Sequence, residues 1–124
     1  MKLLNRSSFM LLPKAPFAQW VANLEGKVSS EDGYEMLSLA QLREAGSVYL
    51  IDEVAQETDF DEMLAVNWQK MFENELSAWD EFGDYWPELS KASFEDWFEL
   101  QTNVMTFDLS KQQIMTANIH ENDS

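Results

Sequence analysis

Residues 58–80 read TDFDEMLAVNWQKMFENELSAWD, and this stretch decides what kind of core the chain can form. Its large apolar residues recur at three- and four-residue spacing over about five turns, which is the period of an α-helix. Thr58 or Asp59 is positioned to cap the start of that helix. The pattern therefore predicts a long helix over residues 59–80.

The apolar residues of this helix cover a wide arc. At about 100° per residue they spread over more than half of the circumference, which is more than one packing surface usually needs. One interpretation is a central helix packed on two sides, with Glu75 reaching solvent near its end. The other is that part of the arc is exposed for a partner, and we favour the first for most of these residues. The part of the arc that would be exposed for a partner under the second interpretation comprises Trp68, Phe72, Leu76 and Trp79.

On either side of the long helix, short apolar runs alternate with turn residues. The run from Val48 to Ile51 predicts a central strand, because both of its faces are apolar. Alternation over residues 104–109 predicts a half-exposed edge strand. Gly26 is expected to end the first helix, and Ser93 with Asp96 to start the last.

Together these elements predict an α+β fold class. Both connections between strands are long enough to cross over one face of a small sheet, and the aromatic helices must then supply most of the core. The three predicted strands of the sheet span about residues 8–12, 48–52 and 103–109. The four predicted helices that cover the sheet span about residues 16–25, 38–45, 59–80 and 93–101.

The length of 124 residues predicts one domain over residues 1–124, with residues of about 112–124 as a frayed tail. The 45% hydrophobic content supports a real core. No stretch approaches the roughly 20 apolar residues of a membrane helix, and the N-terminal apolar run is too short for a signal peptide. We therefore expect a soluble, cytoplasmic protein with no membrane partner.

The formal net charge of −15 is concentrated in one segment. Residues 1–51 carry five acids and five bases, and residues 100–124 carry three acids and one base. Residues 52–99 carry fifteen acids and two bases, a balance of −13, together with ten of the sixteen aromatic residues. A surface of this sign repels nucleic-acid phosphates and attracts a basic protein, so direct nucleic-acid binding is excluded as a function.

Several short motifs resemble those of an uncharacterised family of small acidic bacterial proteins. The run Pro13-Lys14-x-Pro16-Phe17-x-x-Trp20 resembles the start of that family. Its later landmarks are matched by Tyr49-Leu50-Ile51, Trp86-Pro87, Phe94-x-x-Trp97-Phe98 and a final strand ending in Asp108-Leu109. The resemblance spans nearly the whole chain. It implies a bacterial protein with this outline of fold, and no catalytic residue.

The usual catalytic constellations are missing from the sequence, which predicts a protein that is not an enzyme and uses no cofactor. There is no cysteine, and the one histidine, His120, lies near the C-terminus, where a rigidly held imidazole is not expected. The four glycines are scattered, so no phosphate-binding loop is formed. Carboxylates alone leave open an alternative, a small enzyme that depends on a divalent metal. Its ligands would come from two clusters: Asp59, Asp61 and Glu62, and Asp80, Glu81, Asp84 and Glu88.

The loop WDEFGDYW, residues 79–86, is the best candidate for a binding site. Four aromatic and three acidic residues within eight positions cannot all belong to a core. Exposed Trp and Tyr residues are common anchors of protein interfaces, with Trp86 and Tyr85 expected in that role, and acids nearby would select a basic partner. The alternative is a hydrophobic lid over the sheet with solvated acids at its rim. The predicted partner-binding residues are Trp79, Asp80, Glu81, Phe82, Asp84, Tyr85 and Trp86.

The function predicted from the sequence is that of a small acidic protein-binding module, such as an adaptor, an inhibitor or an immunity-type protein. A special case is mimicry of nucleic acid, in which carboxylates replace phosphates on the surface of a nucleic-acid-binding protein. Besides the metal-dependent enzyme, a domain with no strong partner, whose acidity serves solubility alone, remains an alternative.

Overall fold

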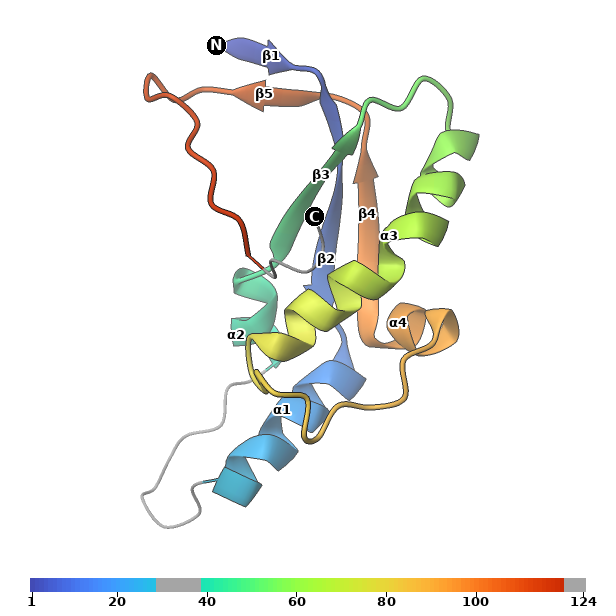
Figure 1. Ribbon diagram of the computed structural model, residues 1–124, viewed down its shortest axis with the longest axis vertical. Coiled ribbons are helices and arrows are strands. Elements are labelled where there is room, and N and C mark those ends of the chain that lie inside the picture. The colour runs from blue at the N-terminus through green and yellow to red at the C-terminus, as the bar shows by residue number, and fades with distance from the viewer. Residues whose placement is uncertain (29–38, 120–124) are drawn as a thin grey trace.

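The computed structural model describes residues 1–28 and 39–119, with the side chains of residues 25–28 left out of the description. Figure 1 shows the course of the chain. The strands are β1 (Lys2–Leu4), β2 (Arg6–Pro13), β3 (Ser47–Asp52), β4 (Phe98–Asn103) and β5 (Thr106–Asp108). The helices are α1 (Ala15–Val28), α2 (Leu39–Glu44), α3 (Thr58–Ser77) and α4 (Lys91–Trp97). The fold class is α+β, as the sequence predicts.

The main sheet has three antiparallel strands in the order β3-β2-β4 (Figure 1). The prediction that Val48 to Ile51 forms the central strand is wrong, because β2 is central and β3 lies at an edge. Tyr49 and Ile51 face the helices, whereas Val48 and Leu50 point to the other face and are 58% and 52% exposed. An apolar residue on each face therefore did not indicate burial on each face here.

The third strand of the sheet is β4, and it begins earlier than predicted. Helix α4 ends at Trp97, and Phe98 at once adopts extended backbone angles of −134° and 141°. The predicted helix over residues 93–101 is therefore too long, and the predicted strand over residues 103–109 starts too late. The aromatic spacing from Phe94 to Phe98 matches a helix, but Phe98 and Leu100 alternate with polar residues and continue as a strand.

A second, two-stranded sheet pairs β1 with β5 and places Leu3 opposite Phe107. Strand β1 was not predicted from the sequence, and the residues of β5 were predicted to belong to the main sheet. After β5, no helix or strand forms in the described residues up to Ile119. Figure 1 shows this C-terminal segment descending on the side of β3.

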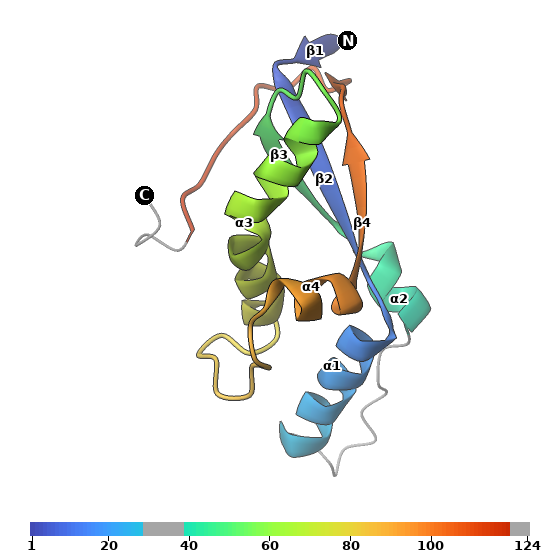
Figure 2. The ribbon, with the colours of Figure 1, turned by 90° about the vertical axis from the view of Figure 1, so that its right-hand side faces the viewer.

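The core lies between one face of the sheet and the helices. Figure 2 shows α3 and α4 on that face, with α1 below the lower end of the sheet. The prediction that aromatic residues of the helices build the core is confirmed, since Phe72 contacts Phe94, Trp97 and Phe98 with ring centroids 5.7 to 5.9 Å apart. Of the part of the arc that could be exposed for a partner, Phe72 and Leu76 are fully buried and Trp68 is half-buried, whereas Trp79 is 39% exposed.

The residues at which the helices begin and end differ from those predicted from the sequence. Helix α1 passes through Gly26 and ends at Val28, so Gly26 does not terminate it. The N-cap of α3 is Glu57, without a side-chain cap, rather than Thr58 or Asp59. Ser90, not Ser93, caps α4, and its hydroxyl accepts the Ser93 N–H at 3.0 Å. The start expected for α2 at residue 38 lies outside the described residues.

Candidate protein-binding surface

The loop after α3, residues 79–86, is held in one conformation by its own hydrogen bonds. The carboxylate of Asp80 accepts the Tyr85 N–H at 2.7 Å, and the Asp80 carbonyl accepts the indole N–H of Trp86 at 2.9 Å. Trp20 of α1 donates its indole N–H to the Tyr85 carbonyl at 2.8 Å. Gly83 has a φ of 76°, a conformation that costs a residue with a side chain about 1 kcal/mol or more. The loop is therefore pre-organised and attached to α1.

The aromatic side chains of this loop divide into two groups. Trp86 is half-buried, packs against the core and lies over Gly83, whose added Cβ would stand 3.5 Å from its ring. Phe82, Tyr85 and Trp79 are 83%, 48% and 39% exposed. Part of the loop therefore packs as a lid, and the rest presents aromatic surface to solvent.

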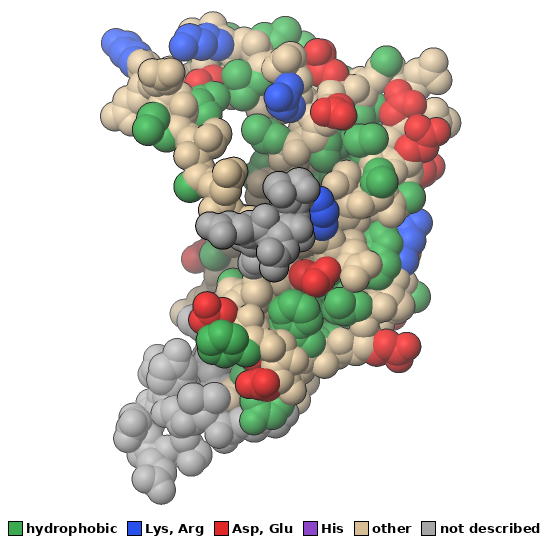
Figure 3. Space-filling model, in the orientation of Figure 1, with side chains coloured by type: hydrophobic (Ala, Val, Ile, Leu, Met, Phe, Trp, Pro, Cys, Tyr) green, Lys and Arg blue, Asp and Glu red, His purple; other side chains and the backbone are tan. Residues whose placement is uncertain are grey.

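The acidic residues of the loop also divide into an exposed group and a half-buried residue that holds the loop. Glu81 and Asp84 are exposed on either side of Phe82 and Gly83, whereas Asp80 is half-buried and serves the loop's own hydrogen bonds. Figure 3 shows acidic and hydrophobic side chains interspersed over the lower part of this face. The seven predicted site residues therefore lie on one pinned loop, and five of them face solvent.

A groove of about 680 Å³ borders the exposed part of the loop. Trp79 and Phe82 supply aromatic walls, and Glu81 is its charged lining residue. The last turn of α3 and Ile119 of the C-terminal segment close the remaining sides. No local sequence pattern indicated Ile119, because it lies about 40 residues beyond Trp79 in the chain.

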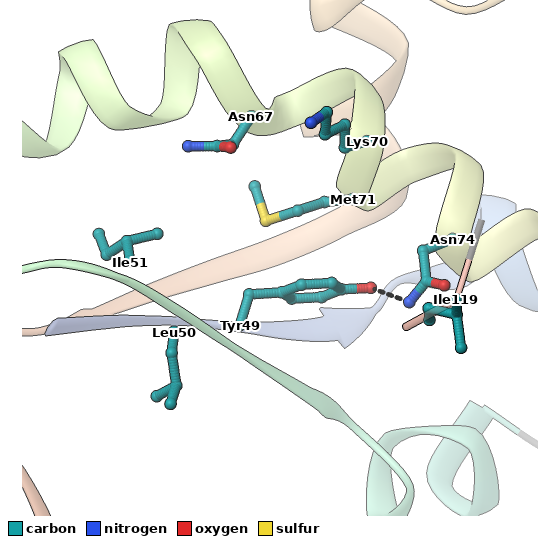
Figure 4. Close-up of a pocket in the computed structure, with 8 residues that line it drawn as sticks. All are labelled: Tyr49, Leu50, Ile51, Asn67, Lys70, Met71, Asn74 and Ile119. Carbon is teal, nitrogen blue, oxygen red and sulfur yellow. Dashed lines mark hydrogen bonds between the residues drawn. The ribbon is translucent and has the colours of Figure 1, made fainter. Parts of the chain in front are cut away.

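A second, smaller groove of about 250 Å³ lies between α3 and the edge strand β3 (Figure 4). Tyr49 reaches across it, donating its hydroxyl proton to the carboxylate of Glu75 and accepting from the Asn74 amide at 2.9 Å. Burial, and then the negative charge of Glu75, raise the pKa of the Tyr49 phenol above its usual range. Glu75, which was expected to reach solvent, is half-buried, and its carboxylate accepts the hydroxyl proton of Tyr49 within the apolar arc of α3.

The carboxylate clusters do not converge into a metal centre within the described ranges, where no three Asp, Glu or His side chains could hold one ion. Asp59 instead accepts the Gln56 N–H at 3.1 Å near the start of α3. His120 lies outside the described residues. Within the described residues, the two carboxylate clusters therefore do not form the metal site that the alternative enzyme would need.

Comparisons with known proteins give no assignment: no family model, no curated protein and no solved structure matches the chain. Within the described residues, none of the helices has the length and apolar character needed to cross a membrane.

Proposed function

We propose that this protein is a binding module that uses the loop of residues 79–86 to dock on a basic surface of a partner protein. The observation that carries the proposal is the exposure of Phe82, 83%, on a loop fixed by hydrogen bonds. A rigid, exposed aromatic side chain loses little conformational entropy on binding, and aromatic residues of this kind contribute strongly to interfaces.

The chemistry of the groove favours a basic partner. A lysine or arginine side chain entering it would lay its aliphatic stem along Trp79 or Phe82 and bring its charge to Glu81. The wider balance of −13 over residues 52–99 would speed the encounter with a positive surface, and this steering weakens as salt is added.

Within this proposal the contact residues are Phe82, Tyr85 and Trp79, with Glu81 and Asp84 steering. Trp86 packs against the core and Asp80 holds the loop, so both would act on binding through the shape of the loop.

The test compares proteins captured from the source cells by the wild type, by F82A/Y85A and by V66A. Val66 is an exposed apolar residue of α3 and serves as the matched control. We expect a basic protein that the wild type and V66A retain at about 0.05 M salt and lose at about 0.5 M. F82A/Y85A should not retain it, and a titration of the purified pair should reproduce this order. If no retained protein depends on the loop residues, the proposal is wrong.

A further inference from the structure

The two grooves lie end to end along one face of α3. The helix residues that line them recur at three- and four-residue spacing, which places them on a single stripe of the helix surface. The smaller groove, beside β3, is lined by Asn67, Lys70, Met71 and Asn74, and the larger groove, beside the loop, by Ser77 and Ala78. The stripe therefore continues from one groove into the other.

Ile119 is the lining residue that the two grooves share. Figure 4 shows Ile119 at the end of the smaller groove at which Asn74 lies. Ser77, one turn further along α3, already lines the larger groove. The Ile119 side chain therefore lies across the stripe at the junction of the two grooves. Without this side chain they would join into one groove along about 16 Å of the helix, from Asn67 to Ala78.

The segment that carries Ile119 is held weakly to the rest of the protein. Residues 109–119 are all exposed to solvent. The hydrogen bonds at its start are local, since the Ser110 N–H donates to the Asp108 carboxylate at 2.8 Å and the Gln112 N–H donates to the Ser110 hydroxyl at 3.0 Å. Residues 113–119 form no hydrogen bond or ion pair with another described residue. Ile119 itself is 65% exposed, so little apolar surface is returned to water when it leaves the grooves.

We propose that residues 110–119 form an autoinhibitory strap, in which Ile119 occupies the junction of the two grooves and must be displaced by a binding partner. This inference rests on the proposed function, because the larger groove is part of the proposed docking surface. With the strap in place, a partner side chain that enters beside Glu81 stops at Ile119. With the strap displaced, the partner can extend along α3 toward Tyr49. Because the partner binds only the open form, the strap lowers its apparent affinity.

The first experiment needs no partner and uses the absence of cysteine from the chain. In the full-length variant A78C/N118C, one thiol lies on the exposed end of the α3 stripe and the other lies next to Ile119 in the chain. A short bifunctional thiol reagent should join them. Adding I119S should slow this cross-linking at least about threefold, because the strap then loses the side chain that enters the grooves.

The matched control for this cross-linking experiment adds M115S to A78C/N118C instead of I119S. Met115 belongs to the same segment, is 86% exposed and lines neither groove, so the rate should stay that of A78C/N118C. Equal cross-linking rates with I119S and with M115S would overturn the proposal, because the segment would then approach α3 without the help of Ile119.

The second experiment measures access to the joined groove with Nile red, a neutral apolar dye, as the probe. If Ile119 blocks the junction, the full-length variant I119S should bind the dye at least about threefold more tightly than the wild type, and M115S should bind it as the wild type does. If Ile119 is instead a fixed wall of the groove, I119S should bind the dye more weakly, because apolar surface is lost. Weaker or unchanged binding by I119S therefore contradicts the strap. Circular dichroism checks that each variant retains the fold.

The third experiment uses the purified basic partner from the capture test of the proposed function. I119S should lower its dissociation constant at least about threefold relative to the wild type and M115S. A partner that depends on the loop residues but binds wild type and I119S equally would overturn the strap and leave the proposed function standing. If no such partner is captured, the proposed function fails, and the cross-linking and dye measurements decide on the strap by themselves.

Discussion

At the scale of single residues, Ser7 shows how a small buried side chain can join distant segments. It lies fully buried in β2, and its hydroxyl donates to the Val104 carbonyl at 2.9 Å and accepts the Val54 N–H at 2.9 Å. One serine thus connects the central strand to the turn before β5 and to the loop before α3. Buried backbone groups left without such a partner are costly.

We therefore expect S7A to lower the free energy of unfolding by about 1–3 kcal/mol, since it leaves two backbone groups unpaired. The neighbouring S8A is the matched control. Ser8 is also buried but forms no side-chain hydrogen bond with a described residue, so a change within about 0.5 kcal/mol is expected. Urea denaturation of both variants provides the measurement. Equal losses of unfolding free energy in S7A and S8A would show that the two hydrogen bonds of Ser7 do not add to the stability.

Tyr49 is the second residue with a distinct physical role. Its raised pKa, caused first by burial and then by Glu75, means that the folded state holds the phenol proton more tightly than the unfolded state. The stability that this provides is fully present below the ordinary tyrosine pKa of about 10 and is lost as the pH rises above it.

From this sign we predict that the wild type loses stability above about pH 10 more steeply than Y49F. At neutral pH, Y49F should be less stable by about 1–2 kcal/mol, because Glu75 and Asn74 lose a shared partner. Urea unfolding at pH 7, 9 and 10.5 measures both effects. Parallel pH profiles would show that Tyr49 does not cause the alkaline loss.

At the scale of elements, the loop after α3 combines a structural half and an exposed half. Its packing on α1 through Trp20 and on the core through Trp86 fixes the positions of Phe82 and Tyr85. Elsewhere, Arg43 of α2 contacts Glu99 of β4 at 2.8 Å and the Pro13 carbonyl of β2 at 2.9 Å. Short elements are thus held by side chains that reach their neighbours.

The two halves of the loop predict opposite results for two aromatic substitutions. W86A should lower the free energy of unfolding by roughly 2–4 kcal/mol, because a half-buried ring leaves the core. F82A should change it by less than about 0.5 kcal/mol, since Phe82 contributes mainly exposed surface. Thermal unfolding of both variants needs no partner. A large loss of unfolding free energy in F82A would show that Phe82 packs in the fold and is not an exposed contact residue.

At the scale of the whole molecule, charge is distributed unevenly, with a balance of −13 over residues 52–99. These acids lie at the end of β3, in the loop before α3, along α3, in the loop that follows it, in α4 and at the start of β4. Within the described residues they form two ion pairs with bases, Arg43 to Glu99 and Lys91 to Glu95. Like charges are therefore held near one another in the folded state.

We accordingly expect sodium chloride to stabilise the fold, with the melting temperature rising by a few degrees between about 0.01 M and 0.3 M. Screening over a Debye length of about 8 Å at 0.15 M relieves repulsion that the unfolded chain relaxes by expanding. Differential scanning calorimetry at constant pH measures the change. A melting temperature that falls over this range would contradict a concentrated acidic surface.

The sequence by itself determined the features that depend on local pattern. The period of residues 58–80 specified the long helix, although the helix ends at Ser77 and not at the predicted residue 80, and the aromatic content of the helices specified the core. The crowding of aromatic and acidic residues in the loop of residues 79–86 identified a surface of mixed character. These features follow from neighbours in the chain, whose spacing fixes which side chains share a face.

Only the tertiary structure decided which partner each element meets. It made β2 rather than β3 the central strand, it turned Phe98 from a helical residue into the first residue of β4, and it gave Glu75 a phenol as its partner. Strand order and such contacts join residues far apart in the chain. No local spacing encodes them, because they depend on how all the elements fill one core together.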